Sequence, residues 1–180
     1  MQLGQPVRVE RLALFERQVA ADKIVIENIV VDGRIEQMTV ETRTSLADAL
    51  RDELGVTSVR LGCEQGVCGS CSVVVDGVAQ RSCLTLAVQA DGTQVETLAG
   101  LAEGIEDLRS AFSRHFAVQC GFCASGVLVT AAVWLTTASA VDEDAVRSML
   151  SGNVCRCSGY EGMVRAVLEV AADRGLTGSG

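Results

Sequence analysis

The sequence predicts an α+β fold, in which an N-terminal half rich in strands precedes an all-helical half. β-rich runs and Asp-Gly turn signals dominate the chain up to about residue 98. Beyond that point the hydrophobic pattern changes to helical periodicity. The eight cysteines divide evenly, four to each half. We therefore expect two units, over residues 23–98 and 99–175, with an N-terminal extension over 1–22 and a frayed tail over 176–180.

The N-terminal half contains two hairpin signals and one short helix. The run "KIVIENIVVDGRIEQMTV" predicts two strands that turn at Asp32-Gly33, and "SVVVDGVAQRSC" predicts two more that turn at Asp76-Gly77. Between them, "TSLADALRDELG" predicts a helix that Thr44 or Ser45 caps and that Gly55 follows. A last strand is expected in "TQVETLAGL".

The helical half is expected to contain four helical segments. They are "EDLRSAFSRHF", "GVLVTAAVWLTT", "DEDAVRSMLSG", which Asp142 can cap, and "MVRAVLEVAADRG". No long Gly/Pro/Ser linker separates the halves, so we expect them to pack tightly. The stretch 116–141 has no charged residue, but polar residues and glycines interrupt it, which favours a buried helix over a transmembrane one.

Composition narrows the classes of function. The chain has 180 residues, a formal net charge of -8 and a 48% apolar fraction, so it can bury a core and is expected to repel nucleic acid. No apolar run near the first residue resembles a secretion signal, which predicts a cytoplasmic protein with reduced thiols.

The cysteines form two sets with different spacings. The first, C-x4-C-x2-C-x11-C, comprises Cys63, Cys68, Cys71 and Cys83. A disulfide framework fits poorly with a cytoplasmic chain of this size, and structural zinc sites usually show paired C-x2-C knuckles. Three cysteines in one loop and a distant fourth match the plant-type ferredoxin spacing, which predicts a 2Fe-2S cluster.

Three glycines lie among the cysteines of this loop. Gly62, Gly66 and Gly69 would let the loop curl so that backbone N–H groups point at the cluster sulfurs. Ordinary turn formation is the alternative explanation for these glycines.

The second set, C-x2-C-x31-C-x-C, comprises Cys120, Cys123, Cys155 and Cys157. The first two lie at the start of the apolar helical segment, and the last two follow the third helical segment in "SGNVCRCSGY". A pair at a helix start and a pair in a loop can close around one metal centre, and nearby helix N-termini would favour its negative charge.

With both sets in view, the chain resembles the iron–sulfur subunit of the xanthine oxidase family of molybdenum hydroxylases. The matching residues are "GCEQGVCGSCSVVVDG" with Cys83, then "QCGFCASG" and "GNVCRCSGY". The resemblance implies a β-grasp ferredoxin-like domain and a four-helix domain, each with one 2Fe-2S cluster. It also implies that Gln119 and Cys157 contact the pterin of a molybdenum cofactor on a partner chain, although Gln119 is alternatively a helix cap or a surface residue.

The function that this resemblance implies is electron transfer within an enzyme complex. Electrons would pass from a molybdopterin cofactor on a large subunit, through the two clusters, to FAD on a medium subunit or to an external acceptor. The substrate would be an N-heterocycle, an aldehyde or carbon monoxide, and the complex a dimer of heterotrimers. No catalytic acid or base is expected in this chain: the lone histidine, His115, is interpreted as a surface or interface residue. A free two-cluster ferredoxin shuttle and an iron–sulfur sensor are the alternatives, although no basic DNA-binding pattern is visible.

Overall fold

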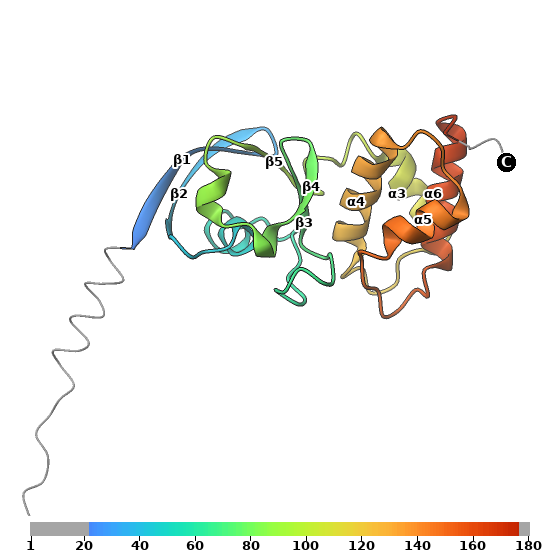
Figure 1. Cartoon of the computed structure of the whole chain (residues 1–180), viewed down its shortest axis with the longest axis horizontal. Helices are drawn as coiled ribbons and strands as arrows, with labels where there is room; N and C mark the ends of the chain where they lie inside the picture. The colour runs from blue at the N-terminus through green and yellow to red at the C-terminus, as the bar shows by residue number, and fades with distance from the viewer. Residues whose placement is uncertain (1–21, 177–180) are drawn as a thin grey trace, which may run out of the picture.

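The computed structural model of the chain describes residues 22–176. The extension expected over residues 1–22 therefore lies, apart from Asp22, outside the described residues. The same holds for all of the expected tail except Leu176, whose carbonyl oxygen accepts the Val141 N–H over 2.7 Å. The described chain is α+β, with a mixed sheet at one end and helices at the other (Figure 1).

The five-stranded sheet has the order β2-β1-β5-β3-β4. Strands β1 (Lys23–Val31) and β2 (Arg34–Glu41) pair antiparallel, as do β3 (Ser72–Val75) and β4 (Val78–Arg81). Both hairpins turn at the predicted Asp-Gly dipeptides, in which both residues have positive φ. The short strand β5 (Gln94–Glu96) lies between them, parallel to β1 and antiparallel to β3.

The helix predicted after β2 is present but irregular. Helix α2 (Leu46–Asp48) begins at Ser45, whose side chain accepts the Asp48 N–H, and it widens into a π-helical turn, η1 (Ala49–Glu53). Leu46 and Leu50 are fully buried and belong to the aliphatic core that covers the sheet. Two 3-10 turns, η2 (Ser82–Leu84) and η3 (Ala87–Ala90), connect β4 to β5. This half thus packs around isoleucine, leucine and valine.

The helical half contains α3 (Glu106–Arg114), α4 (Ala124–Thr137), α5 (Glu143–Leu150) and α6 (Glu161–Asp173). Asp142 caps α5 as predicted, because its side chain accepts the Ala145 N–H over 2.8 Å. Helix α4 is the buried centre of this half, with eight buried residues. None of the helices within residues 22–176 combines the length and apolarity that a bilayer crossing requires.

The two halves meet along a tight contact that we call the seam. Helix α4 packs against β3 (Figure 1). A Cβ on Gly126 of α4 would overlap the carbonyl oxygen of Gly69. Asn153 Nδ2 donates to that same carbonyl over 3.3 Å, and the Val154 N–H donates to the carbonyl of Cys68 over 2.8 Å. The prediction that the halves pack tightly is confirmed.

Candidate iron–sulfur sites

The first cysteine set gathers at one end of the β3–β4 hairpin. Cys63, Cys68 and Cys71 lie on the loop between η1 and β3, and Cys83 lies in η2, directly after β4. The Cys63 sulfur accepts backbone N–H groups from Cys68 over 3.3 Å and from Gln65 over 3.4 Å. These donors, Cys68 first, lower the pKa of Cys63 to about 7. The loop therefore stabilises a thiolate at this position.

The remaining members of this set form a second close pair. Burial, followed by the neighbouring Cys71 thiol, raises the pKa of Cys83 to about 11. Cys68 lies beside Cys63, because its N–H donates to the Cys63 sulfur. The four cysteines thus come together as two pairs, Cys63 with Cys68 and Cys71 with Cys83.

The three predicted loop glycines lie in different surroundings. The Gly66 N–H acts to lower the pKa of the Cys83 thiol, and the φ of Gly66 is +76°. A Cβ on Gly62 would lie 3.2 Å from the Cys68 sulfur. Gly69 has a different role at the seam, because a Cβ there would lie 2.6 Å from both Asn153 Nδ2 and the carbonyl oxygen of Gly152. Turn formation alone does not account for these close approaches.

The second set forms at the start of α4 and on the loop between α5 and α6. Cys123 is the N-cap residue of α4, and the neighbouring Cys155 thiol contributes to the pKa of Cys123. The sulfurs of Cys157 and Cys120 lie 3.6 Å apart. This set therefore also comprises two close pairs, each joining the helix start to the loop.

The electrostatic environment differs between the members of this second set. Burial, followed by the hydrogen bond to Cys155, raises the pKa of Cys123 to about 12. Burial acts in the same direction on Cys155, but hydrogen bonds outweigh it and lower the pKa of that thiol to about 7. Those bonds come from the hydroxyl of Ser158 over 3.2 Å and from its N–H over 3.4 Å. The hydrogen bond to Cys120 raises the pKa of Cys157.

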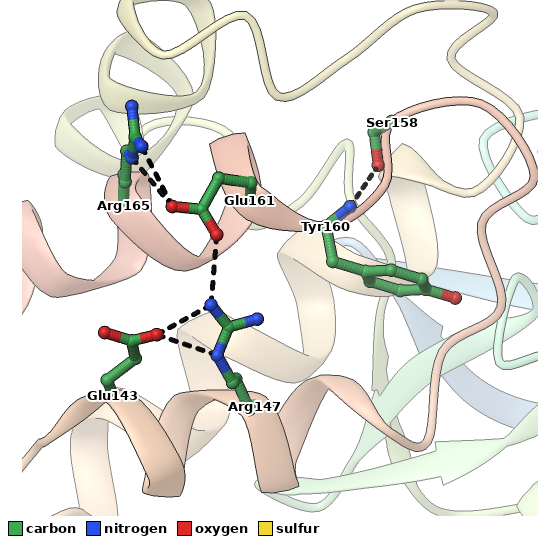
Figure 2. Close-up of polar contacts among 6 residues, drawn as sticks. All are labelled: Glu143, Arg147, Ser158, Tyr160, Glu161 and Arg165. Carbon is green, nitrogen blue, oxygen red and sulfur yellow. Dashed lines mark hydrogen bonds and ion pairs between the residues drawn. The ribbon is translucent and has the colours of Figure 1, made fainter.

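Tyr160 holds the loop that carries Cys155 and Cys157. Its hydroxyl accepts the Cys155 N–H over 2.8 Å and donates to the carbonyl of Asn153 over 3.2 Å. Its backbone has a φ of +67°, and its N–H donates to the hydroxyl of Ser158 over 3.2 Å (Figure 2). A tyrosine in the left-handed region is strained, so these bonds keep the loop in a conformation that it would not adopt alone.

Ion pairs fix the start of α6 beside this loop. Glu161 accepts from Arg147 of α5 over 3.0 Å and from Arg165 over 3.0 Å, and Arg147 also contacts Glu143 (Figure 2). The two arginines, Arg147 first, lower the pKa of Glu161. Helix α6 is thereby tied to α5 at the point where the cysteine loop ends.

The cysteines differ in their exposure to solvent. Cys71 is 2% exposed and Cys123 is 8% exposed, whereas Cys120 and Cys157 are exposed at the surface. Gln119 is exposed next to Cys120. One edge of the second site therefore faces outward.

The arrangement of sulfurs is compatible with two-iron clusters. All eight cysteines are free of disulfide bonds. Two thiol pairs per set supply four thiolates, the number that a 2Fe-2S cluster takes from a protein.

Several residues at these sites escaped sequence reasoning. Arg81, Asn153, Ser158 and Tyr160 contact the cysteine loops, but none belongs to a recognisable ligand spacing. Ser158 and Tyr160 lie within three residues of a cysteine, so their proximity in sequence was an available signal. Arg81 and Asn153 act across the seam, where local sequence carries no signal.

Two family models match the chain. A model described as a 2Fe-2S iron-sulfur cluster binding domain matches residues 9–113, and one described as a 2Fe-2S binding domain matches residues 95–168. Together they include all eight cysteines. Both halves therefore belong to families that bind 2Fe-2S clusters.

Whole-chain relatives place both halves in one enzyme family. The chain is 44% identical to the nicotine 6-hydroxylase small subunit of Paenarthrobacter nicotinovorans over 86% of this chain and 94% of the relative. The solved quinoline 2-oxidoreductase of Pseudomonas putida 86 matches with a TM-score of 0.77 and 46% identity, over 87% of this chain and 99% of that chain. Aldehyde oxidoreductase from Desulfovibrio gigas matches with a TM-score of 0.75 and 38% identity, over 83% of this chain but 17% of that longer chain. This chain belongs to the small iron–sulfur subunits of the xanthine oxidase family, the electron-transfer components of multi-subunit molybdenum oxidoreductases.

Proposed function

We propose that this chain transfers electrons from a molybdopterin-bearing large subunit to an FAD-bearing medium subunit or an external acceptor, in an enzyme that hydroxylates an N-heterocycle. The substrate class is supported by the names of the relatives, which act on nicotine and quinoline. The observation that carries the proposal is the outward-facing edge of the second cysteine set. A redox site that opens at the surface needs a partner to supply its electrons and to exclude water.

We assign the eight cysteines as ligands in two sets of four. Cys63, Cys68, Cys71 and Cys83 hold one 2Fe-2S cluster, and Cys120, Cys123, Cys155 and Cys157 hold the other. Each cluster supplies one-electron chemistry when bound. The chain supports that chemistry through the N–H donors to Cys63 and Cys155 and through the burial of Cys71 and Cys123.

Electrons enter the chain at the helical half in this proposal. Cys120 and Cys157 are the exposed ligands, and Gln119 lies exposed beside them with an amide that can both donate and accept hydrogen bonds. We assign Gln119 and Cys157 as the residues that contact the partner's pterin.

Exposed apolar side chains lie close in sequence to the ligands of the second set. Phe116 is 85% exposed, Val154 is 50% exposed, and Phe122 is 45% exposed. Phe116 also has a φ of +51°, an uncommon conformation for an aromatic residue. An apolar surface beside exposed ligands supports a permanent partner over a free shuttle, which meets each partner only briefly.

The finer architecture is also a proposal. The sheet order supports a β-grasp ferredoxin-like domain over 23–98, and the helices α3 to α6 support a four-helix domain over 99–175. A dimer of heterotrimers is the assembly that we propose. Eight free thiols support a reducing, cytoplasmic location.

Purification of the native complex tests the proposal. We expect a large chain with molybdenum and a flavin-bearing chain to co-purify with this one, and the complex to reduce a dye when given pyridine or quinoline substrates. Aldehydes and purines serve as comparison substrates. Purification of this chain alone, with its clusters but without a molybdenum chain, would establish the free ferredoxin instead.

A further inference from the structure

Arg81, the last residue of β4, extends from the N-terminal half across the seam. Its Nη1 donates to the hydroxyl of Ser72 in β3, and its Nη2 donates to the carbonyl oxygen of Gly152 over 2.5 Å. Ser72 directly follows Cys71, and Gly152 lies three residues before Cys155. One guanidinium therefore connects the two cysteine loops.

The same group lies against the middle of the first loop. A Cβ on Gly69, between Cys68 and Cys71, would lie 3.0 Å from Arg81 Nη2. A Cβ on Gly152 would lie 3.1 Å from the same nitrogen. The absence of side chains at both positions lets the guanidinium occupy the space between the loops.

The charge of Arg81 lacks a carboxylate partner among residues 22–176. Six other arginines in this range form ion pairs: Arg43, Arg109, Arg114, Arg147, Arg165 and Arg174. Arg81 is half-buried, yet both of its hydrogen-bond acceptors are neutral. Removing a cation from water without a counter-charge is costly, so an anion nearby would account for its position.

We propose that Arg81 is a positioning residue and a shared counter-charge for the two cluster sites. A 2Fe-2S cluster with four thiolate ligands is negatively charged and gains a further negative charge on reduction. A guanidinium between two such sites favours the reduced form of each. Its hydrogen bonds to Ser72 and Gly152 fix the position of one cysteine loop relative to the other. This inference rests only on the part of the proposed function that assigns two clusters to the chain.

The test uses the full chain produced with both clusters. Iron and sulfide analysis of the unmodified chain comes first, because absence of iron there would contradict the proposed function rather than the role of Arg81. The midpoint potentials of both clusters are then measured by redox titration with electron-spin detection. The variants are Arg81→Gln, which removes the charge, and Arg81→Lys, which keeps the charge but not the planar fork.

Arg34→Gln is the matched control, because it removes one exposed arginine charge at the start of β2. We expect Arg81→Gln to lower both potentials, Arg81→Lys to lower them less, and Arg34→Gln to leave them unchanged. Potentials in Arg81→Gln that equal those in Arg34→Gln would overturn the inference. So would an equal shift in the lysine and glutamine variants, since the charge would then be irrelevant.

Loss of the clusters from Arg81→Gln would also test the counter-charge role of Arg81. If Arg81→Lys keeps its iron while Arg81→Gln loses it, a cation is required at this position and the inference stands. If both variants lose iron to the same extent, only the shape of the guanidinium matters, and the counter-charge role is refuted.

Discussion

The backbone N–H of Val154 donates a hydrogen bond to the carbonyl oxygen of Cys68 over 2.8 Å. Cys68 is a proposed ligand of the first cluster, and Val154 directly precedes Cys155, a proposed ligand of the second. This bond joins the two cysteine loops directly. A change on either side of the seam is therefore expected to affect both.

Substitution of Gly126 by alanine tests the packing at the seam. The new Cβ would overlap the carbonyl oxygen of Gly69, so the halves must separate locally. Overpacking of this kind costs about 1–3 kcal/mol, and we expect the free energy of unfolding to fall by that amount. Chemical denaturation measures it. Gly104→Ala is the control, because the nearest atom to its Cβ lies 3.6 Å away; equal stability of the two variants would contradict the described seam.

Substitution of Cys120 by serine tests the ligand assignment. We expect one of two electron-spin signals of the reduced chain to disappear and the iron content to fall from about four to about two per chain. Cys63→Ser should remove the other signal. Iron analysis and electron-spin spectroscopy check both variants, and survival of both signals in Cys120→Ser would show that the assignment is wrong.

Tyr160→Phe should weaken the second site selectively. The variant loses the hydroxyl that accepts the Cys155 N–H and donates to the Asn153 carbonyl. Leaving such groups unpaired costs roughly 1–3 kcal/mol, so the loop should open more often. Release of iron to a chelator, followed through the two electron-spin signals, measures this. The first cluster is the internal control, and equal loss from both sites would contradict a local role.

Gln119→Ala should slow electron transfer into the chain without disturbing its clusters. Loss of one hydrogen bond to the pterin is worth about 1 kcal/mol, so we expect a rate lower by roughly five- to tenfold. Stopped-flow measurement of cluster reduction after substrate addition to the complex gives this rate. Gln37→Ala, at an exposed position on β2, is the control. An unchanged rate would favour the alternative reading of Gln119 as a surface residue.

Stability of the helical half should decline in acid. Hydrogen bonds from Arg174, Arg147 and Arg114, respectively, lower the pKa values of Asp107, Glu161 and Glu169. A carboxylate with a lowered folded-state pKa stabilises the fold above its unfolded pKa, about 4 for these groups. That contribution is lost as the pH falls through the lower, folded-state value.

The pH dependence of Glu161→Gln checks this prediction. Its unfolding free energy should fall less steeply between pH 5 and pH 3, as roughly estimated from ordinary carboxylate pKa values, than that of the unmodified chain. The pairs are exposed, so we expect a modest difference. Glu27→Gln, at an exposed site on β1, supplies the comparison. Identical pH profiles for all three proteins would refute the contribution of Glu161.

Local patterns predicted the helices and strands well. Asp32-Gly33 and Asp76-Gly77 mark the two hairpins because the turn needs positive φ at both residues. Ser45 and Asp142 mark helix starts because their side chains accept N–H groups within one turn. These signals depend on neighbours in sequence, so the sequence alone carries them.

Contacts across the seam were beyond such reasoning. Arg81 contacts Gly152, and Asn153 contacts Gly69, at separations of 71 and 84 residues. The sequence also does not show why α2 widens into a π turn, or that a Cβ on Gly69 would meet Asn153 and Gly152 across the seam. These outcomes depend on how the halves pack, which periodicity and spacing do not determine.

The overlap that any side chain on Gly126 would make with Gly69 has a consequence for module exchange. The contact joins two backbones, so no change of side-chain rotamer can make room for a differently shaped half from another protein. A chimera that joins residues 23–98 of this chain to the helical half of a relative must bring a matching glycine and a matching acceptor for Arg81. The two halves are thus complementary to each other, and we expect a domain exchange between relatives to succeed only when both halves are exchanged together.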